Sequence, residues 1–211
     1  MPLVDAAPCP AGPASGGPAF DRRDLVMRCA VDAIAFTGLG AVRLEDIAAR
    51  AHMSIGHVMY YFGTRDRLLL ATLLWSEEDA RQELIAATAR MRSPERRLAR
   101  FVTAYLPTTA RDPRWGLWFQ LSAAPGEPVA DTGALREVDA SWRAVFTELV
   151  RSGIDAGAFR SFDPDDLAEW FLPYLDGLAL DILTGPPGAP VTPTVRRAQA
   201  RVRRALTDGA R

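Results

Sequence analysis

The chain has 211 residues, 48% of them hydrophobic, and its 25 basic and 26 acidic side chains leave a net charge of −1. This length fits one large domain or two modest ones, and it is enough to bury a sizeable core. No stretch of about eighteen or more apolar residues is free of charges, so we expect no membrane-spanning helix. The two cysteines, Cys9 and Cys29, do not suggest a disulfide framework.

The first twenty residues are rich in proline, glycine and alanine. They lack the basic and apolar regions of a secretory signal peptide, so we expect a cytoplasmic protein. A segment of this composition does not bury enough apolar surface to fold. The sequence therefore predicts a disordered arm over residues 1–20.

The first predicted helix covers residues 22–37. Its apolar residues recur at helical spacing and form one stripe: Leu25, Cys29, Ala33 and Phe36. We expect this stripe to face a core, with Cys29 as a small buried side chain.

Two short helices are predicted next, over residues 44–51 and 55–61. Apolar side chains share one face of the first helix: Leu44, Ile47, Ala48 and Ala51. Ser54 is a good N-cap for the second helix, because its hydroxyl can accept from an otherwise unpaired amide. Val58 and Phe62 are four residues apart and are expected to pack inward. A short exposed helix braced by its neighbour is the geometry that enters the DNA major groove.

Capping residues and proline positions predict six further helices. They cover residues 65 to about 91, 94 to about 109, 113–121, about 129–156, 164 to about 183, and 194–208. No segment with the two-residue period of a strand stands out. The sequence therefore predicts an all-α protein of about nine helices without an internal repeat.

The order and spacing of the helix-turn-helix residues resemble the DNA-binding motif of TetR-family transcriptional repressors. The matching residues are Phe36, Gly38, Gly40, Asp46, Ile47, Ala48, Arg50, Ala51, Ser54, Gly56, Tyr60, Tyr61, Phe62, Arg65 and Leu68. The resemblance covers about residues 21–72. It implies a helix-turn-helix DNA-binding domain over 21–66 and an effector-binding and dimerisation domain over 67–211.

Four positions depart from the family pattern: Arg43, His52, Met59, where the family often has tyrosine, and Arg65, where it has lysine. The family usually has glycine in the turn, where this chain has His52; the position often needs a positive φ, which histidine adopts less easily than glycine. The family usually has threonine or serine at the start of the second helix, where Arg43 stands and cannot accept an amide proton. We expect Asp46 to compensate through the helix dipole.

The resemblance and the exposed short helix together predict the DNA contacts. The predicted DNA-binding residues are Arg43, Ser54, Ile55, Gly56, His57, Met59, Tyr60, Tyr61, Thr64 and Arg65. Gly56 would let the backbone approach base edges, His57 would donate to guanine, and Arg65 would contact phosphate. An ordinary surface histidine and a solvated arginine are the alternatives, and core packing is possible for either Tyr60 or Tyr61.

The charge of this segment is nearly balanced, because residues 21–70 carry seven arginines and six acidic residues. The prediction of DNA binding therefore depends on where the charges lie and not on their number.

Aromatic residues are frequent in the C-terminal two thirds of the chain and suit an apolar ligand cavity with polar tips. The predicted ligand-binding residues are Trp115, Trp118, Phe119, Gln120, Trp142, Phe146, Tyr174 and Asp176. Gln120, Asp139 and Asp176 are expected to orient a polar or cationic ligand. Packing in a core or a dimer interface is the alternative for each aromatic ring.

The helices at 129–156 and 164–183 resemble the dimerisation helices of the family. The predicted interface residues are Leu172, Leu175, Leu178, Ala179 and Ile182, on the face that also carries Gly177. Packing of these residues inside one subunit is the alternative.

No catalytic constellation, metal cluster or phosphate-binding glycine loop is found in the sequence, so no enzyme activity, metal or cofactor is predicted. We predict a homodimeric repressor that binds a pseudo-palindromic operator and is released by a small, largely apolar or aromatic ligand. Two alternatives are a regulator without an effector, favoured by a sealed C-terminal core, and a small-molecule-binding protein or enzyme in which the helix-turn-helix is only scaffold.

Overall fold

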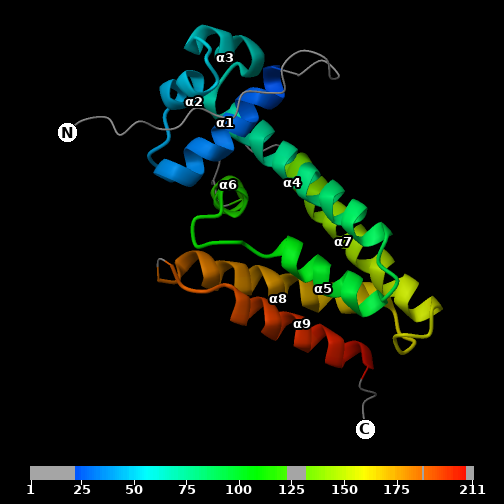
Figure 1. Ribbon diagram of the computed structural model, residues 1–211. Helices are drawn as coiled ribbons and strands as arrows, with labels where there is room; N and C mark the ends of the chain where they lie inside the picture. Colours follow the sequence, from blue (N-terminus) through cyan, green and yellow to red (C-terminus); the bar gives the residue numbers. More distant parts are fainter. Residues whose placement is uncertain (1–21, 123–131, 187, 208–211) are drawn as a thin grey trace.

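The computed structural model describes residues 22–122, 132–186 and 188–207, so the predicted N-terminal arm lies outside the described residues. The described residues form nine helices and no strand, which confirms the all-α prediction (Figure 1). The helices are α1 (Arg22–Thr37), α2 (Leu44–Arg50), α3 (Ile55–Phe62), α4 (Arg65–Ala89), α5 (Pro94–Tyr105), α6 (Pro113–Ser122), α7 (Thr132–Asp155), α8 (Pro164–Thr184) and α9 (Thr192–Thr207).

Helix α5 ends earlier than the sequence pattern predicts. Leu106 already has extended backbone angles, with φ −72° and ψ 153°. The next residue is Pro107, whose ring disfavours the helical region for the residue before it. The helix therefore stops at Tyr105, and the chain continues as a loop to α6.

An N-terminal core lies between α1, α2, α3 and the first turns of α4. Cys29 is fully buried in it, as predicted, together with Val58 and Leu69. The prediction for Phe36 is wrong, because this side chain is 59% exposed and lies under the Arg50 guanidinium. The buried face of α1 runs through Ala30, Ala33 and Ile34 instead, which turns Phe36 toward solvent.

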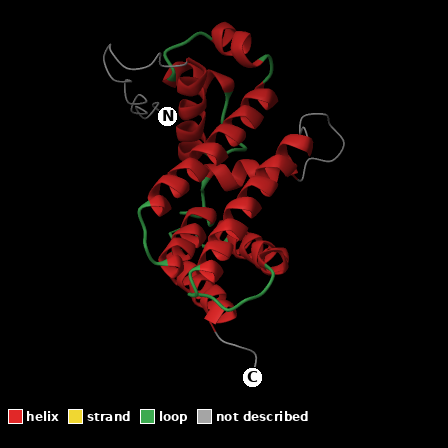
Figure 2. Cartoon of the chain, turned by 90° about the vertical axis from the view of Figure 1, so that its right-hand side faces the viewer, coloured by secondary structure: helices red, strands yellow, loops and turns green. Residues whose placement is uncertain are grey.

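A second core fills the space between α5, α7, α8, α9 and the C-terminal part of α4. Figures 1 and 2 show α1, α2 and α3 at one end of an elongated molecule, with α9 at the other end. Among the helices of the described residues, none is long and apolar enough to cross a membrane.

Three helices, α4, α6 and α7, connect the cores, and α7 contributes Leu135 to the N-terminal core and Phe146 to the second. Helix α4 contributes Leu69 and Leu73 to the N-terminal core and Leu84 to the second. Helix α6 contributes Leu117 to the N-terminal core and Trp115 to the second. A displacement of one of these helices in one core therefore also moves its residues in the other core.

Candidate nucleic-acid interface and ligand cavity

The turn between α2 and α3 has the backbone that the sequence predicts. His52 has a φ of +52°, the only positive φ of a non-glycine residue in the described part of the chain. The amide of Met53 donates to the Ala48 carbonyl at 2.9 Å and closes the turn. A positive φ is uncommon for a residue other than glycine, and the backbone hydrogen bonds of the turn hold His52 in this conformation.

Local capping contacts fix both ends of α3. At its start, Ser54 Oγ accepts from the amide of His57 at 3.2 Å, which confirms the predicted cap. Gly63, with a φ of +76°, ends the helix and starts the connection to α4. Thr64 Oγ1 then accepts from the amide of Arg67 at 3.1 Å and caps α4. Helix α3 is thus held in one orientation relative to α2 and α4.

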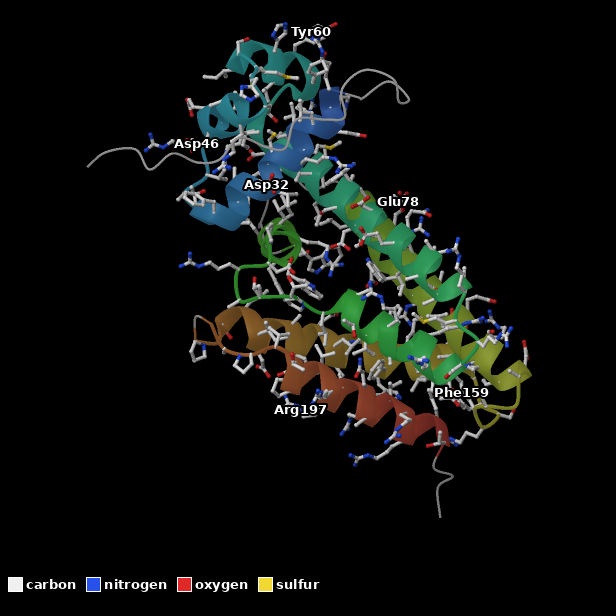
Figure 3. The ribbon with its side chains drawn as sticks, viewed as in Figure 1. Asp32, Asp46, Tyr60, Glu78, Phe159 and Arg197 are labelled. Atoms are coloured by element: carbon white, nitrogen blue, oxygen red, sulfur yellow. The ribbon has the colours of Figure 1, made fainter. Side chains whose placement is uncertain are left out.

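Helix α3 has one buried and one exposed face. Val58 and Phe62 are buried, as predicted, and anchor it to the N-terminal core. The exposed side chains on the outer face are Ile55, His57, Met59 and Tyr60, with Gly56 among them. Tyr60 is 82% exposed and extends away from the rest of the molecule (Figure 3), whereas Tyr61 is partly buried against the N-terminal core. This face is free to contact a DNA groove.

The two predicted phosphate-contacting arginines differ in their surroundings. Arg43 is exposed at the start of α2, and its amide donates to Asp46 Oδ2 at 3.1 Å. The Arg65 guanidinium instead donates to the carbonyls of Leu39 and Val42, each at 3.4 Å. Arg65 therefore holds the corner between α1 and α2.

Sequence reasoning missed Arg67, which is exposed one turn into α4, beside the end of α3. Its amide is bound by the Thr64 cap, and its guanidinium lies near Gly63. The sequence signal was present, because an arginine in the first turn of a capped helix is suited to contact a phosphate.

A small cavity lies where α4, α5, α6 and α7 meet. Its lining residues are Glu77, Tyr105, Arg114, Trp115, Trp118, Val138, Asp139 and Trp142. Its volume is about 20 Å³, which holds about one water molecule. Three of the eight predicted ligand-binding residues, Trp115, Trp118 and Trp142, line it.

A buried network joins the walls of this cavity. Glu77 is only 7% exposed, and its Oε2 accepts from Arg114 Nη1 at 3.1 Å and from Trp142 Nε1 at 2.8 Å. The next residue, Glu78, is exposed and extends outward from α4 (Figure 3). The sequence does not reveal this network, because Arg114 and Trp142 lie 37 and 65 residues from Glu77 in the chain.

Negative charge surrounds the cavity. Tyr105 Oη donates to Asp176 Oδ1 at 2.8 Å. Burial raises the pKa of Asp176, and the nearby Asp139 raises it further, while the bond from Tyr105 acts in the opposite direction. The pKa of Tyr105 is raised well above its ordinary value by burial and then by Asp176 and the other carboxylates. Glu77 and Asp139 thus line the cavity together with one guanidinium, that of Arg114, whereas Asp176, a predicted ligand-binding residue, lies behind Tyr105 and is not part of the wall.

The other predicted ligand-binding residues do not line the cavity. Phe146 is fully buried in the second core, and Gln120 is exposed. Phe119 packs against the Trp115 ring and lines a groove beside α1. Tyr174 lies on the α8–α9 side, with the Arg201 guanidinium 5.2 Å from its ring centroid. Neither the spacing on one helix nor the residue type distinguishes cavity rings from core rings.

The predicted dimer face of α8 also needs correction. Four of its five side chains are at most 6% exposed because they are buried in the core of their own chain: Leu172, Leu175, Leu178 and Ala179. Ile182 is partly buried. The helical period places the other side of α8 outward, where Trp170 and Leu180 are 41% and 47% exposed.

Two family models match the chain. The model of the C-terminal domain of BetI-type transcriptional repressors matches residues 94–210, more than half of the chain, and that of the bacterial regulatory proteins of the tetR family matches 27–72. This chain belongs to the TetR family. The family resemblance that the helix-turn-helix suggested is therefore confirmed, and it extends through the C-terminal helices.

Individual relatives agree with this assignment. The HTH-type transcriptional regulator BetI of Agrobacterium fabrum is 28% identical over 164 residues, 74% of each chain. A transcriptional regulator from Saccharomonospora viridis, solved in complex with choline, has a TM-score of 0.75 and 25% identity over 89% of this chain and 98% of its own. A TetR transcription regulator from Haloarcula marismortui shares the fold, with a TM-score of 0.71 and 22% identity over 88% and 98% of the two chains.

TetR-family membership decides between the functional classes that the sequence left open. The chain is a ligand-responsive DNA-binding transcriptional regulator, as predicted. The family and the relatives are regulators, not enzymes. The helix-turn-helix end is thus the functional DNA-binding end of the TetR-family chain.

Proposed function

We propose that this TetR-family protein is a repressor that leaves its operator when a small organic cation of the choline type binds between α4, α5, α6 and α7. The observation that carries this proposal is the chemistry of the cavity wall. The wall contains three tryptophan rings and a tyrosine, and its carboxylates outnumber its one positively charged side chain. The sequence predicts an apolar or aromatic ligand, and the cavity wall adds the requirement that this ligand carry a positive charge.

Aromatic faces and carboxylates favour the same ligand. The faces of aromatic rings attract quaternary ammonium groups, and tryptophan attracts them most strongly. In the cavity wall the carboxylates of Glu77 and Asp139 exceed the one guanidinium of Arg114, and Asp176 behind Tyr105 adds to them, so the site disfavours an anion. The choline complex of the Saccharomonospora viridis regulator and the BetI-type C-terminal match support a ligand of this class.

We propose that DNA contacts come from the exposed face of α3 and from the arginines beside it. Ile55, His57 and Tyr60 extend from this face, and Gly56 leaves room for base edges. Arg43 and Arg67 are the exposed cations at the helix starts and suit phosphate contacts. The protein would then act in the cytoplasm, where its operator lies.

A homodimer is proposed to place two α3 helices in successive major grooves of a pseudo-palindromic operator. The outward stripe of α8 suits its interface, because Trp170, Pro173, Gly177 and Leu180 are exposed at spacings of three and four residues. Sedimentation equilibrium of the purified protein tests this part. A monomer mass at operator-binding concentrations would contradict it.

The cationic effector is tested by calorimetry with two ligands of nearly the same shape. Choline is expected to bind, whereas its neutral isostere 3,3-dimethyl-1-butanol is expected to bind at least about tenfold more weakly, because it lacks the charge. Asp139→Asn, in the cavity wall on α7, should weaken choline binding. The control Asp79→Asn removes an exposed carboxylate of α4 outside the cavity and should leave choline binding unchanged. Equal binding of the two ligands would contradict a cation site.

A further inference from the structure

Arg114 occupies the place that a ligand cation would take. Its guanidinium carbon lies 5.5 Å from the Trp142 ring centroid and 6.0 Å from that of Trp115. It pairs with the buried Glu77 carboxylate at 3.1 Å, and both side chains are at most 13% exposed. A cation held by aromatic rings and a carboxylate is the arrangement that the cavity would offer to an effector.

The remaining space leads to the same conclusion. The cavity of about 20 Å³ beside Arg114 admits about one water molecule. A quaternary ammonium ion therefore has no room until a side chain leaves. The candidate to leave is Arg114, because it is the one lining residue with the charge of the ligand.

We propose that Arg114 is a built-in cation that fills the effector site in the DNA-binding state and that an effector cation acts by displacing it. The inference rests on the proposed cationic effector and names the regulation of that site. It also accounts for the tightly filled C-terminal core, which a regulator without any effector would share.

The position of Arg114 in the fold connects this exchange to DNA binding. Arg114 lies in the first turn of α6, and Glu77 lies in the middle of α4, so their ion pair links two of the helices that join the N-terminal core to the second core. The Arg114 guanidinium also donates to the carbonyls of Ala104 and Tyr105 at the end of α5, at 3.0 and 2.8 Å. Displacement would break these bonds together and weaken the attachment of α6 to α4 and α5, leaving the bond from Trp115 Nε1 to the Tyr105 carbonyl.

An effector that needs Arg114 to leave binds with an apparent affinity reduced by the fraction of molecules in which the site is empty. Removal of the guanidinium should therefore raise the affinity for choline by about tenfold or more. It should also weaken operator binding without effector, because the α4–α6 link is absent.

The test uses Arg114→Ala in the full-length protein, with Arg111→Ala as the matched control, an exposed arginine just before α6. Choline and methylguanidinium are titrated into each protein by calorimetry and by thermal unfolding. In Arg114→Ala both cations should bind more tightly than in the wild type and raise the unfolding temperature further. Arg111→Ala should behave as the wild type. If Arg114→Ala does not purify, Arg114→Lys keeps the charge but loses the planar guanidinium, and tighter choline binding than in the wild type is again expected.

Each outcome decides between the proposals. If Arg114→Ala binds choline or methylguanidinium and the wild type does not bind choline, the built-in cation is supported and choline fails as the effector of the wild type. If the wild type binds choline and Arg114→Ala binds it more weakly, the displacement model is wrong and Arg114 contacts the ligand. If neither cation binds to either protein, the inference is overturned.

Discussion

The two ends of this TetR-family chain are specified in different ways. The DNA-binding end is built from about forty consecutive residues whose caps and turn follow local rules, from His52 at its positive φ to the Ser54 and Thr64 caps. The effector end takes its cavity from four consecutive helices, with lining residues spread along the chain from Glu77 to Trp142. A local pattern therefore predicts the first end, and only the fold assembles the second.

This difference implies that changes at one end should leave the other intact, except at the residues that join the two cores. The following variants break or sharpen that comparison, from the largest expected effect to the smallest.

Gly56→Met tests whether the outer face of α3 lies against DNA. A Cβ at this position would meet nothing closer than Ser54 Oγ, at 3.8 Å, and Gly56 is exposed, so the rest of a side chain can extend into solvent. Replacing a helical glycine should even stabilise the protein, by up to about 1 kcal/mol. Operator affinity should fall about 100-fold, the upper range for one lost base-pair contact. Unchanged affinity in an anisotropy titration would remove this face from the interface, whereas choline binding should not change.

His57→Ala tests for direct base reading. A donor to guanine contributes about 1–3 kcal/mol of discrimination at one base pair. Selection from a randomised operator should therefore show relaxed preference at one position in each half-site, with the other positions unchanged. A uniform loss of affinity at every position would assign His57 to the backbone or to the surface.

Arg67→Ala separates the two arginines at the start of α4. Arg67 is exposed, whereas Arg65 is bound to the carbonyls of Leu39 and Val42. Loss of a phosphate contact should weaken binding to all DNA sequences and reduce the salt slope of the binding constant by about one unit. Arg65→Ala should instead lower the unfolding temperature. The reverse pattern would restore Arg65 as the phosphate contact.

Asp176→Asn should have the smallest effect, and at the effector end. Burial raises the pKa of Asp176 above its unfolded value, so its ionised form destabilises the fold at neutral pH. This cost disappears as the pH falls through the folded pKa. The variant should raise the unfolding temperature at pH 7 by at most about 2 °C for a chain of this size, with no gain at pH 4 or below. A lower unfolding temperature at pH 7 would contradict this account.

Much of the fold could be predicted from the sequence because its signals are local. Ser54 caps α3 where the pattern placed it, the helices that follow α3 begin close to their predicted starts, and Cys29 and Val58 are buried. The predicted end of α5 is too late because Pro107 disfavours a helical backbone at Leu106, and the apolar spacing carries no sign of this effect.

The cavity could be predicted only in part. Trp115, Trp118 and Trp142 line it, but Phe146 has the same character and lies in the core. Glu77 and Arg114 are charged residues that a helical pattern places in solvent, and only the packing of α4 against α6 and α7 buries them as a pair. The face of α8 was misassigned because inward and outward stripes of an apolar helix look alike in sequence.

The central claim is that an organic cation controls the DNA affinity of this protein. Fluorescence anisotropy with labelled DNA from its own upstream region, at several salt concentrations and beside a scrambled control, tests it most directly. We predict tight, salt-dependent binding to the upstream DNA, weakened about tenfold or more by choline and unchanged by 3,3-dimethyl-1-butanol. Binding to the upstream DNA that choline leaves unchanged, or that both compounds weaken equally, would contradict the claim.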